Sequence, residues 1–274
     1  MSDRIVVITG ASDGIGAAAA RILKKRGDQV VIVGRSKEKT QRVAKELGAP
    51  FYLADFSNFD DVRKLAQHLQ SDLPRIDVLA NNAGGVMGGR LLTIDRFELT
   101  LQVNHLAPFL LTTLLLDALI ASKATVIATS SLANRRAGKL DPDDLTLAHG
   151  YSAQDAYCKA KLMNILFSQE LNRRYHALGL AVASYQPGVV RTNFSSEFGG
   201  SFAVFYTSFL KYVLRSPDKG AETLVWLATT TPDHDWQPGE YFKDKKICRA
   251  NRQAHDPVLA AQLWDASLAA VAIK

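Results

Sequence analysis

Short apolar runs rich in β-branched residues alternate with amphipathic stretches along this chain. The alternation is typical of successive right-handed βαβ units, in which parallel strands build a sheet that helices cover on both faces. We therefore expect an α/β fold with a doubly wound parallel sheet. The expected strands are Ile5–Thr9, Val30–Val33, Phe51–Leu53, Ile76–Ala80, Thr125–Thr129, Ala181–Tyr185 and Tyr241–Phe242. The expected helices are Ile15–Arg26, Lys37–Leu47, Asp60–Gln70, Phe97–Leu119 and Ala156–Ala177.

The composition fits one globular domain over residues 1–274. Of the 274 residues, 47% are hydrophobic and 22% charged, so the chain can bury a sizeable core. Its two cysteines, Cys158 and Cys248, have no metal-ligand spacing, and we expect free thiols and no metal site. The net charge of +6 comes from scattered basic residues without a recognition motif, so no nucleic-acid partner is expected.

The sequence pattern favours a cytoplasmic protein without a stable membrane anchor. No charged n-region with an apolar h-region precedes the strand-like stretch that begins at Ile5. The longest apolar stretch, Leu106–Ala121, contains Pro108 and Asp117 and is shorter than the roughly 20 residues that span a bilayer. We expect this stretch to form a buried helix.

A glycine-rich turn directly follows the first expected strand and opens the first expected helix; it reads Thr9-Gly-Ala-Ser-Asp-Gly-Ile-Gly16. Gly10 permits a tight turn, Gly14 lets the backbone approach a pyrophosphate, and Gly16 lets the helix pack closely, while the helix N-terminus presents free N–H groups to the anion. Such a turn is often only structural, and its spacing differs from G-x-G-x-x-G. Its position favours a dinucleotide-binding, Rossmann-type sheet. The expected contacts are Gly10, Ser12, Gly14, Ile15 and Gly16.

The end of the second strand bears on which dinucleotide binds. An acidic residue there would hold the ribose hydroxyls, whereas a cation would hold a 2′-phosphate. The sequence reads Gly34-Arg-Ser-Lys37, so no carboxylate ends the strand, and Arg35 could pair with phosphate and stack on adenine. We expect NADP(H), with Arg35 and Ser36 among the binding residues; a solvated arginine is the alternative. Asp13 argues the other way, because it places a negative charge near the glycine-rich turn.

Two further strand ends carry small or polar residues. Asp55 could accept a hydrogen bond from the adenine amino group, or it could cap the helix that begins near Asp60. The fourth strand ends in Asn81-Asn-Ala-Gly84, whose small residues leave room for a cofactor, although a turn explains them equally. The expected cofactor contacts from these two strand ends are Asp55, Phe56, Asn82, Ala83 and Gly84.

Tyr157 and Lys161 are four residues apart on an expected helix and therefore share one face. A phenol with a pKa near 10 is a poor acid or base at neutral pH, but a nearby ammonium favours the phenolate and lowers that pKa. Tyr157 could then donate and accept a proton. A tyrosine and a lysine at this spacing also occur together by chance on helix surfaces.

Two more candidates follow from position. Ser130-Ser131 ends the strand Thr125–Thr129, where one hydroxyl could hydrogen-bond a substrate carbonyl or instead cap a helix. Asn104 is polar within an apolar helix and must find hydrogen-bond partners. It is a satisfied core amide or the anchor of a proton relay.

In their order along the chain, these motifs resemble those of the short-chain dehydrogenase/reductase family. The motifs are Thr9-Gly-x-x-x-Gly-x-Gly16, Asn81-Asn-Ala-Gly84, Asn104, Ser131, Tyr157-x-x-x-Lys161 and Pro187-Gly-x-Val-x-Thr192. Each is weak alone, but together they are specific and span nearly the whole chain. Finer features resemble the retinol-dehydrogenase-like branch. These features are Val103-Asn-His-Leu106, Ser130-Ser-Leu-Ala133, the long loop before Tyr157, Gly239-Glu-Tyr-Phe242 and Leu263-Trp264.

The resemblance implies an oxidoreductase that exchanges hydride and proton between NADP(H) and a small-molecule carbonyl or alcohol. Tyr157 would be the acid/base, and Ser131 would orient the carbonyl. Lys161 would bind the nicotinamide ribose and tune Tyr157, and Asn104 would hold a water that links Lys161 to solvent. The residues that would line the nicotinamide are Pro187, Gly188, Val190 and Thr192. The chain departs from membrane-bound members in lacking an N-terminal anchor, and from many NADP users in having Asp13.

Residues 193–215 carry an aromatic stripe that follows the nicotinamide-lining segment. The stripe is Phe194, Phe198, Phe202, Phe205, Phe209 and Tyr212. Its helical spacing, with a hinge at Gly199-Gly200, favours a lid over a lipophilic substrate. A helix packed on the core or on a partner subunit, or a shallow membrane contact, explains the spacing equally. We expect residues 3–192 to form the cofactor-binding and catalytic core, 193–215 the lid, and 216–274 the completion of the sheet.

Two other functions remain open at the sequence level. A non-catalytic dinucleotide-binding redox sensor would keep the glycine-rich turn, but it should lack part of the Tyr157, Lys161 and Ser131 set, which is complete here. A sugar epimerase or dehydratase on a similar fold would need a larger substrate domain. The enzyme could also form a homo-oligomer.

Overall fold

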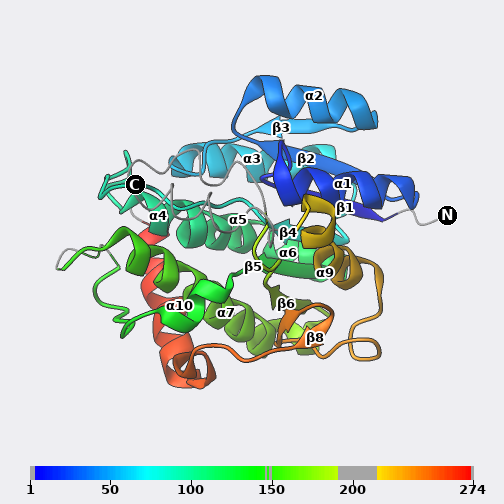
Figure 1. Ribbon diagram of the computed structural model, residues 1–274. Coiled ribbons are helices and arrows are strands. Elements are labelled where there is room, and N and C mark those ends of the chain that lie inside the picture. The colour runs from blue at the N-terminus through cyan, green and yellow to red at the C-terminus, as the bar shows by residue number, and fades with distance from the viewer. Residues whose placement is uncertain (1–3, 146, 148–149, 191–214, 273–274) are drawn as a thin grey trace.

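The computed structural model describes residues 4–145, 147, 150–190 and 215–272. Within these ranges, eight strands form one sheet in the order β3-β2-β1-β4-β5-β6-β7-β8 (Figure 1). Neighbouring strands are parallel except β7 and β8, which are antiparallel. The strands are β1 Ile5–Thr9, β2 Gln29–Gly34, β3 Phe51–Leu53, β4 Val78–Asn81, β5 Thr125–Thr129, β6 Ala181–Tyr185, β7 Tyr241–Lys243 and β8 Lys246–Ile247. The expected α/β fold with a parallel sheet is confirmed.

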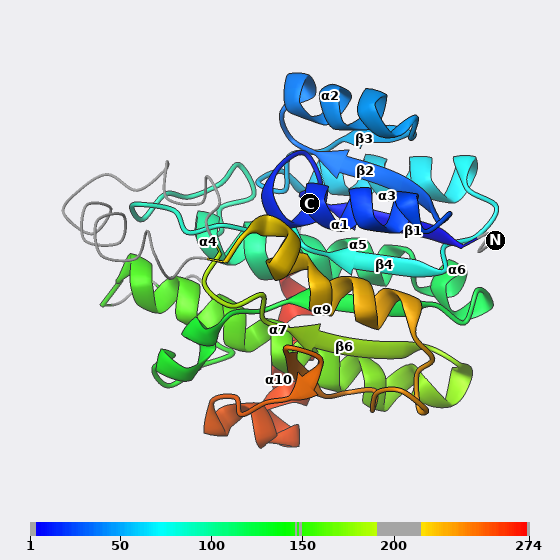
Figure 2. The same cartoon turned by 45° about the vertical axis from the view of Figure 1, so that its right-hand side comes forward.

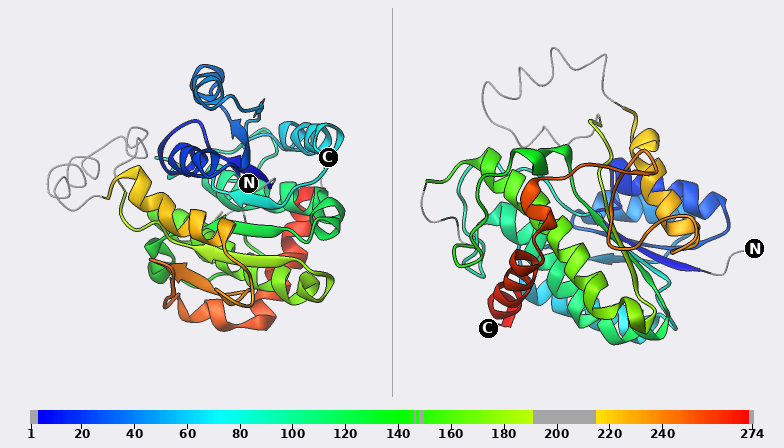
Figure 3. Two further views of the ribbon diagram at one scale, coloured as in Figure 1. Left: turned by 90° about the vertical axis from the view of Figure 1, so that its right-hand side faces the viewer. Right: turned by 90° about the horizontal axis from the view of Figure 1, so that it is seen from below.

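Helices cover both faces of this sheet (Figures 1 and 3). One face packs against α1, α2 and α9, and the other against α3, α5, α7 and α10. Successive strand residues enter opposite cores, as Val6 and Val7 do, because side chains alternate along a strand. The helices are α1 Gly14–Lys25, α2 Lys37–Leu47, α3 Phe59–Asp72, α4 Leu99–Leu101, α5 Ala107–Leu114, α6 Leu116–Ala121, α7 Ala153–Tyr175, α9 Pro217–Thr229 and α10 Pro257–Ala272.

The prediction of a single helix over Phe97–Leu119 is wrong. Glu98 caps α4 by accepting from the Leu101 N–H at 2.8 Å, and five residues of π-helix, Gln102–Leu106, separate α4 from α5. A second break at Leu115 separates α5 from α6. A π-helical turn adds a residue to the helical repeat, and hydrophobic spacing does not reveal it where every side of the helix is buried.

Smaller differences occur at element ends. Helix α7 begins at Ala153, earlier than the expected Ala156, because Ser152 accepts a hydrogen bond from the Asp155 N–H at 3.4 Å and caps the helix. Strand β8 was not expected. It follows a tight turn in which Asp244 has a φ of 51° and the next residue has one of 62°.

Thr192 and residues 193–214 of the expected lid lie outside the described residues, so the lid stays a prediction. Among the helices that the structure describes, none is long and apolar enough to cross a membrane. The apolar stretch Leu106–Ala121 ends the π-helix and continues through α5 and α6. Most of its side chains are buried, as expected.

Candidate active site

The turn after β1 lies at the sheet edge where the parallel strands end; Figure 2 shows β4 and β6 pointing to this edge. Gly10 and Gly14 have φ angles of 64° and 54°, which other residues rarely adopt. A Cβ on Gly10 would lie 2.8 Å from the Cα of Ala83, and one on Gly16 would lie 2.7 Å from Asn82 Nδ2. The turn, the start of α1 and the loop after β4 therefore pack together without room for side chains.

Asn82 holds this turn by hydrogen bonds. Its Nδ2 donates to the carbonyl oxygens of Thr9 at 3.0 Å and Gly10 at 3.3 Å. The Thr9 hydroxyl accepts from the backbone N–H groups of Asn82 and Ala83, each at 3.0 Å. The structure therefore gives Asn82 the turn-forming role, and its contact with a cofactor stays a prediction.

Packing leaves no room for a side chain at Gly34, where β2 ends. A Cβ there would overlap Thr40 Oγ1 and lie 2.9 Å from the Cβ of Ser12. A carboxylate that binds ribose hydroxyls therefore does not fit at this position without a shift of its neighbours. Arg35 follows with an exposed side chain, and Ser36 caps α2.

Asp13 forms an ion pair with a residue that the sequence analysis missed. Its Oδ1 accepts from the Gly14 N–H at 2.8 Å and caps α1, and its Oδ2 lies 3.2 Å from Lys39 Nζ. The negative charge near the glycine-rich turn is thus paired with a lysine on the first turn of α2. The basic run that begins at Arg35 was the available signal for this lysine.

Asp55 does not cap the next helix. Its Oδ1 accepts from the Ser57 N–H at 2.9 Å and from the Ser57 hydroxyl at 2.7 Å, which closes a turn. The cap of α3 is Asn58, whose side chain accepts from the Asp60 N–H at 3.0 Å. Phe56 is buried in the core on the α3 side. Any adenine contact from Phe56 would therefore come from its backbone.

Gly84 is the point where Asn104 and Lys161 meet. A Cβ on Gly84 would overlap Asn104 Oδ1 and lie 3.1 Å from Lys161 Nζ. Within the π-helix, Asn104 Nδ2 donates to Thr100 O and to Gly85 O, each at 2.7 Å. Its Oδ1 accepts from the Gly85 N–H at 3.1 Å. Asn104 is thus a satisfied amide, and its oxygen lies beside the lysine that a proton relay would need.

Lys161 and Tyr157 lie one turn apart on α7, with Lys161 Nζ 5.5 Å from the centre of the Tyr157 ring. The ammonium is buried and donates to Thr129 O at 3.2 Å. Burial lowers the pKa of Lys161 to about 7, because removal from water disfavours the charged form. Tyr157 keeps part of its surface exposed. The pair therefore joins a buried cation to a partly exposed tyrosine.

The two serines after β5 have different environments. Ser130 is buried, and its hydroxyl donates to Lys161 O at 2.7 Å, which fastens β5 to α7. Ser131 is less buried, and its Oγ accepts from the Ala133 N–H at 3.2 Å, which caps the 3₁₀ helix Leu132–Arg136. The capping interpretation thus holds for Ser131. An accepting hydroxyl still has its own hydrogen to donate, so Ser131 remains the candidate for a substrate contact.

Val190 is the last described residue of the segment Pro187–Thr192, which was expected to line the nicotinamide. At Gly220, in the first turn of α9, Val190 approaches Ile15 of the glycine-rich turn. A Cβ on Gly220 would lie 2.7 Å from Val190 Cγ2 and 3.2 Å from Ile15 Cγ1. The side chains of Ile15 and Val190, which are far apart in the sequence, therefore both approach α9 at Gly220.

Gly188, which follows Pro187, has a φ of 79° and packs against Arg215. A Cβ on Gly188 would lie 2.9 Å from Arg215 Nε. The Arg215 guanidinium forms a two-contact ion pair with Asp244 in the β7–β8 turn, and Arg215 Nη2 lies 2.9 Å from Asp244 Oδ2. Arg215 was expected only as the end of the lid segment, and its pairing with Asp244 was not expected, since nothing in the spacing of positions 215 and 244 connects them.

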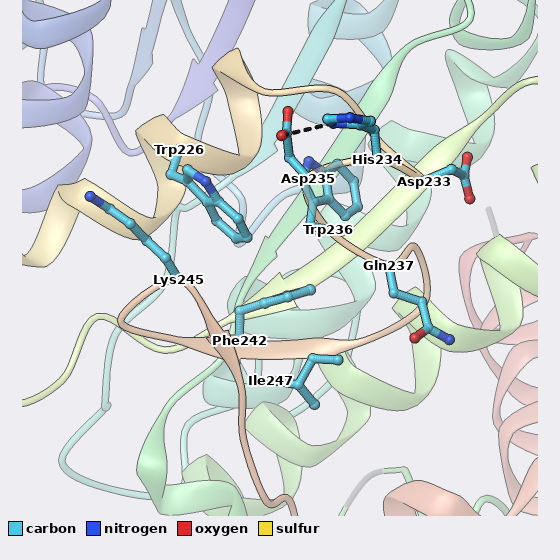
Figure 4. Close-up of a pocket in the computed structure, with 9 residues that line it drawn as sticks. All are labelled: Trp226, Asp233, His234, Asp235, Trp236, Gln237, Phe242, Lys245 and Ile247. Carbon is cyan, nitrogen blue, oxygen red and sulfur yellow. Dashed lines mark hydrogen bonds and ion pairs between the residues drawn. The ribbon is translucent and has the colours of Figure 1, made fainter.

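A cavity of about 510 Å³ lies apart from these residues, between α9 and the β7–β8 hairpin (Figure 4). Its apolar wall is formed by Trp226, Trp236 and Phe242. Asp233, His234 and Asp235 also line it. None of its lining residues belongs to the expected catalytic or cofactor-binding set.

The chain is similar to known proteins over nearly its full length. Residues 4–200 match the family model of the short chain dehydrogenases. A protein of Streptomyces sp. (strain C5) named "Putative daunorubicin C-13 ketoreductase" is 44% identical, covering 98% of this chain and 92% of its own. Human retinol dehydrogenase 11 is 34% identical, covering 96% of this chain and 84% of its own. The chain therefore belongs to the short-chain dehydrogenase family, with retinol-dehydrogenase-like relatives, as its motifs predicted.

Solved structures agree with this assignment. The crystal structure of an uncharacterized protein from Mycobacterium paratuberculosis superposes with a TM-score of 0.80 at 29% identity, covering 100% of this chain and 95% of that one. A short chain dehydrogenase from Shigella flexneri, complexed with NADP, gives a TM-score of 0.67 at 27% identity, covering 88% of this chain and 97% of that one. The chain is thus an oxidoreductase of a family that binds nicotinamide dinucleotides.

The packing around Gly84 generates a first prediction. In Gly84→Ala the new methyl group would overlap Asn104 Oδ1, and we expect a loss of about 1–3 kcal/mol in the free energy of unfolding, together with reduced turnover. Gly85→Ala is the matched control, since its Cβ would meet only Met87 Cε at 3.7 Å. Urea unfolding of both variants measures the difference; equal stability of the two would contradict the packing argument.

The buried ammonium generates a second prediction. With a pKa of about 7 in the folded state and 10.5 when exposed, Lys161 binds more protons in the unfolded chain between these two pH values. The stability of the wild type relative to Lys161→Met should therefore rise with pH through this window, by up to ~1.4 kcal/mol per pH unit, and level off below it. Urea titrations of the cofactor-free proteins test this, and parallel pH curves would show that Lys161 is not desolvated.

Proposed function

We propose that this protein is an NADP(H)-dependent carbonyl reductase or alcohol dehydrogenase in which Tyr157 is the general acid/base. The observation that carries the proposal is the meeting of Asn104 and Lys161 at Gly84, with Lys161 one helical turn from Tyr157. The glycine-rich turn fits a dinucleotide, because its positive φ angles and close packing leave backbone rather than side chains facing the pyrophosphate position. The group that binds there supplies hydride exchange with the substrate carbon.

The residues of the chain handle the proton. The Tyr157 hydroxyl gives a proton to the substrate oxygen in reduction and takes it back in oxidation. Lys161 favours the phenolate form through its positive charge, and Ser131 donates a hydrogen bond to the same substrate oxygen. Asn104 places its Oδ1 beside Lys161, where it supports passage of the proton toward solvent.

Three features support NADP(H) over NAD(H). The strand end at Gly34 has no room for a carboxylate, Arg35 is exposed beside it, and Lys39 pairs with Asp13. A 2′-phosphate near these residues would meet two cations and one carboxylate that is already paired. The related dehydrogenase from Shigella flexneri, which was solved with NADP, is consistent with this preference.

The substrate that we propose is a lipophilic carbonyl compound or the corresponding alcohol. Support comes from two relatives, of which one is named a retinol dehydrogenase and the other a daunorubicin C-13 ketoreductase. A lid formed by residues 193–215, homo-oligomerisation and a cytoplasmic location stay predictions from the sequence.

The proposed acid/base role generates a third prediction. Tyr157→Phe keeps the ring and removes the only atom that can carry the proton, so turnover should nearly vanish while cofactor affinity stays close to that of the wild type. Steady-state turnover and cofactor titration by nicotinamide fluorescence separate the two effects. If the variant keeps wild-type turnover, Tyr157 is not the acid/base.

The cofactor preference generates a fourth prediction. Arg35→Ala should weaken NADPH binding by roughly 1.5–3 kcal/mol, the scale of a charge-assisted hydrogen bond, and leave NADH binding nearly unchanged. Arg42→Ala, which removes an exposed cation from α2, the helix that follows Arg35, is the matched control. Titration with both cofactors gives the answer. Equal losses for NADPH and NADH would mean that Arg35 does not recognise the 2′-phosphate.

A further inference from the structure

Asn134 lies just after the candidate Ser131, and all of its amide atoms are hydrogen-bonded in the buried interior. Its Nδ2 donates to the Ser131 carbonyl oxygen at 2.6 Å and to the Tyr241 hydroxyl at 3.0 Å. Its Oδ1 accepts from the Asn251 N–H at 2.9 Å. A reversed amide would place its oxygen against the Ser131 carbonyl oxygen and its N–H groups against the Asn251 N–H, so these two contacts specify the orientation of the amide. The Tyr241 hydroxyl can donate or accept and fits this orientation.

Asn251, from the segment between β8 and α10, hydrogen-bonds to the same turn. Its Nδ2 donates to Asn134 O at 3.2 Å and to Ala137 O at 3.1 Å. Its Oδ1 accepts from the Gln253 N–H at 3.0 Å, which caps the short 3₁₀ helix Arg252–His255. The 3₁₀ helix after Ser131 is therefore held at its carbonyl end by a segment more than a hundred residues away in the sequence.

Gln253 adds two hydrogen bonds to the loop that leads to α7. We use the term clamp for the hydrogen bonds made by Asn134, Asn251, Gln253 and Tyr241. Gln253 Nε2 donates to Gly138 O at 3.0 Å, and its Oε1 accepts from the Leu140 N–H at 2.8 Å. The Gly138 N–H donates to Asp155 Oδ1 at 3.0 Å, in the first turn of α7 and two residues before Tyr157. The same C-terminal segment thus fixes the turn that presents Ser131 and the loop that leads to the Tyr157 helix.

Tyr241, on β7, is the residue by which the sheet contacts Asn134. It is 2% exposed, and burial, with the nearby Cys248 and Tyr157, raises its pKa, so it stays neutral while Tyr157 exchanges protons. Its oxygen accepts from Asn134, and Ser130 is a second polar neighbour of its hydroxyl. A neutral phenol at this place supports the Ser130-Ser131 backbone without competing for the proton.

We propose that Asn134 is a positioning residue that, held by Asn251 and Tyr241, fixes the Ser131 turn so that the Ser131 hydroxyl faces the substrate oxygen. The inference rests on the proposed function, because positioning matters only if Ser131 contacts a reacting carbonyl. Its physical basis is the demand for orientation in catalysis, where a displacement of about 1 Å can cost about 100-fold in rate. The short bond to the Ser131 carbonyl acts on the backbone and leaves the hydroxyl available.

The test is a double-mutant cycle on single-turnover carbonyl reduction with Asn134→Ala, Ser131→Ala and the double variant. If Asn134 acts through Ser131, Asn134→Ala should lower the rate roughly 10- to 100-fold in the wild-type background and hardly at all in Ser131→Ala. The same fold-loss in both backgrounds would show a general structural effect and overturn the proposal. Asn172→Ala, at the far end of α7, is the matched control and should leave the rate unchanged.

A second variant and a second measurement distinguish loss of positioning from loss of folding and from failure of the proposed function. Asn251→Ala keeps Asn134 and the backbone bond from the Asn251 N–H to Asn134 Oδ1, and it removes the side-chain contacts of Asn251 with Asn134 O, Ala137 O and Gln253. It should therefore show a smaller loss with the same dependence on Ser131. Hydrogen exchange in the cofactor-free protein should rise across residues 131–137 in both variants. Unchanged exchange there overturns the clamp whether or not the enzyme turns over. Faster exchange in a protein that reduces no carbonyl would instead keep the clamp and reject the proposed function.

Discussion

Lys161 donates from a buried ammonium to the carbonyl oxygen at the end of β5, and this contact determines how the neighbouring elements come together. A buried cation needs hydrogen-bonding partners, because an ammonium outside water is costly unless it is satisfied. The end of β5 supplies one partner, Gly84 leaves the space, and the Asn104 amide oxygen lies beside that space. The π-helix, the loop after β4 and the bond from Ser130 to Lys161 O all converge on this point.

The two halves of the site are held by different kinds of interaction. At the glycine-rich turn, where we propose that the cofactor binds, close backbone packing among the glycines dominates, so side chains are excluded. On the substrate side, side-chain amides hold the backbone, as at Asn104 and Asn134. A rigid backbone suits the binding of an extended anionic cofactor. A serine and a tyrosine in fixed positions suit proton transfer, because the substrate oxygen must be placed to within a fraction of an ångström.

Much of this arrangement could be predicted from the sequence, because local patterns determine it. Alternating apolar runs located strands such as Ile5–Thr9 and Thr125–Thr129, and the motif order placed Tyr157 and Lys161 on one helix. The features that escaped prediction have no sequence pattern that distinguishes them. The π-helix changes the helical repeat without changing hydrophobicity. Asp55 and Asn58 both have side chains that can cap a helix, so the sequence alone does not show that Asn58 caps α3. The pairing of Lys39 with Asp13 likewise has no local signature.

We propose that this chain turns over carbonyl compounds rather than only binding a dinucleotide. The most direct measurement mixes the purified protein with NADPH or NADH and a panel of aldehydes, ketones, retinoids and steroids, and follows nicotinamide absorbance together with formation of the alcohol. We expect loss of NADPH absorbance with formation of an equal amount of alcohol for at least one lipophilic carbonyl, at a higher rate than with NADH. Tight NADPH binding without alcohol from any member of the panel would contradict it and would identify a binding protein that does not catalyse the reaction.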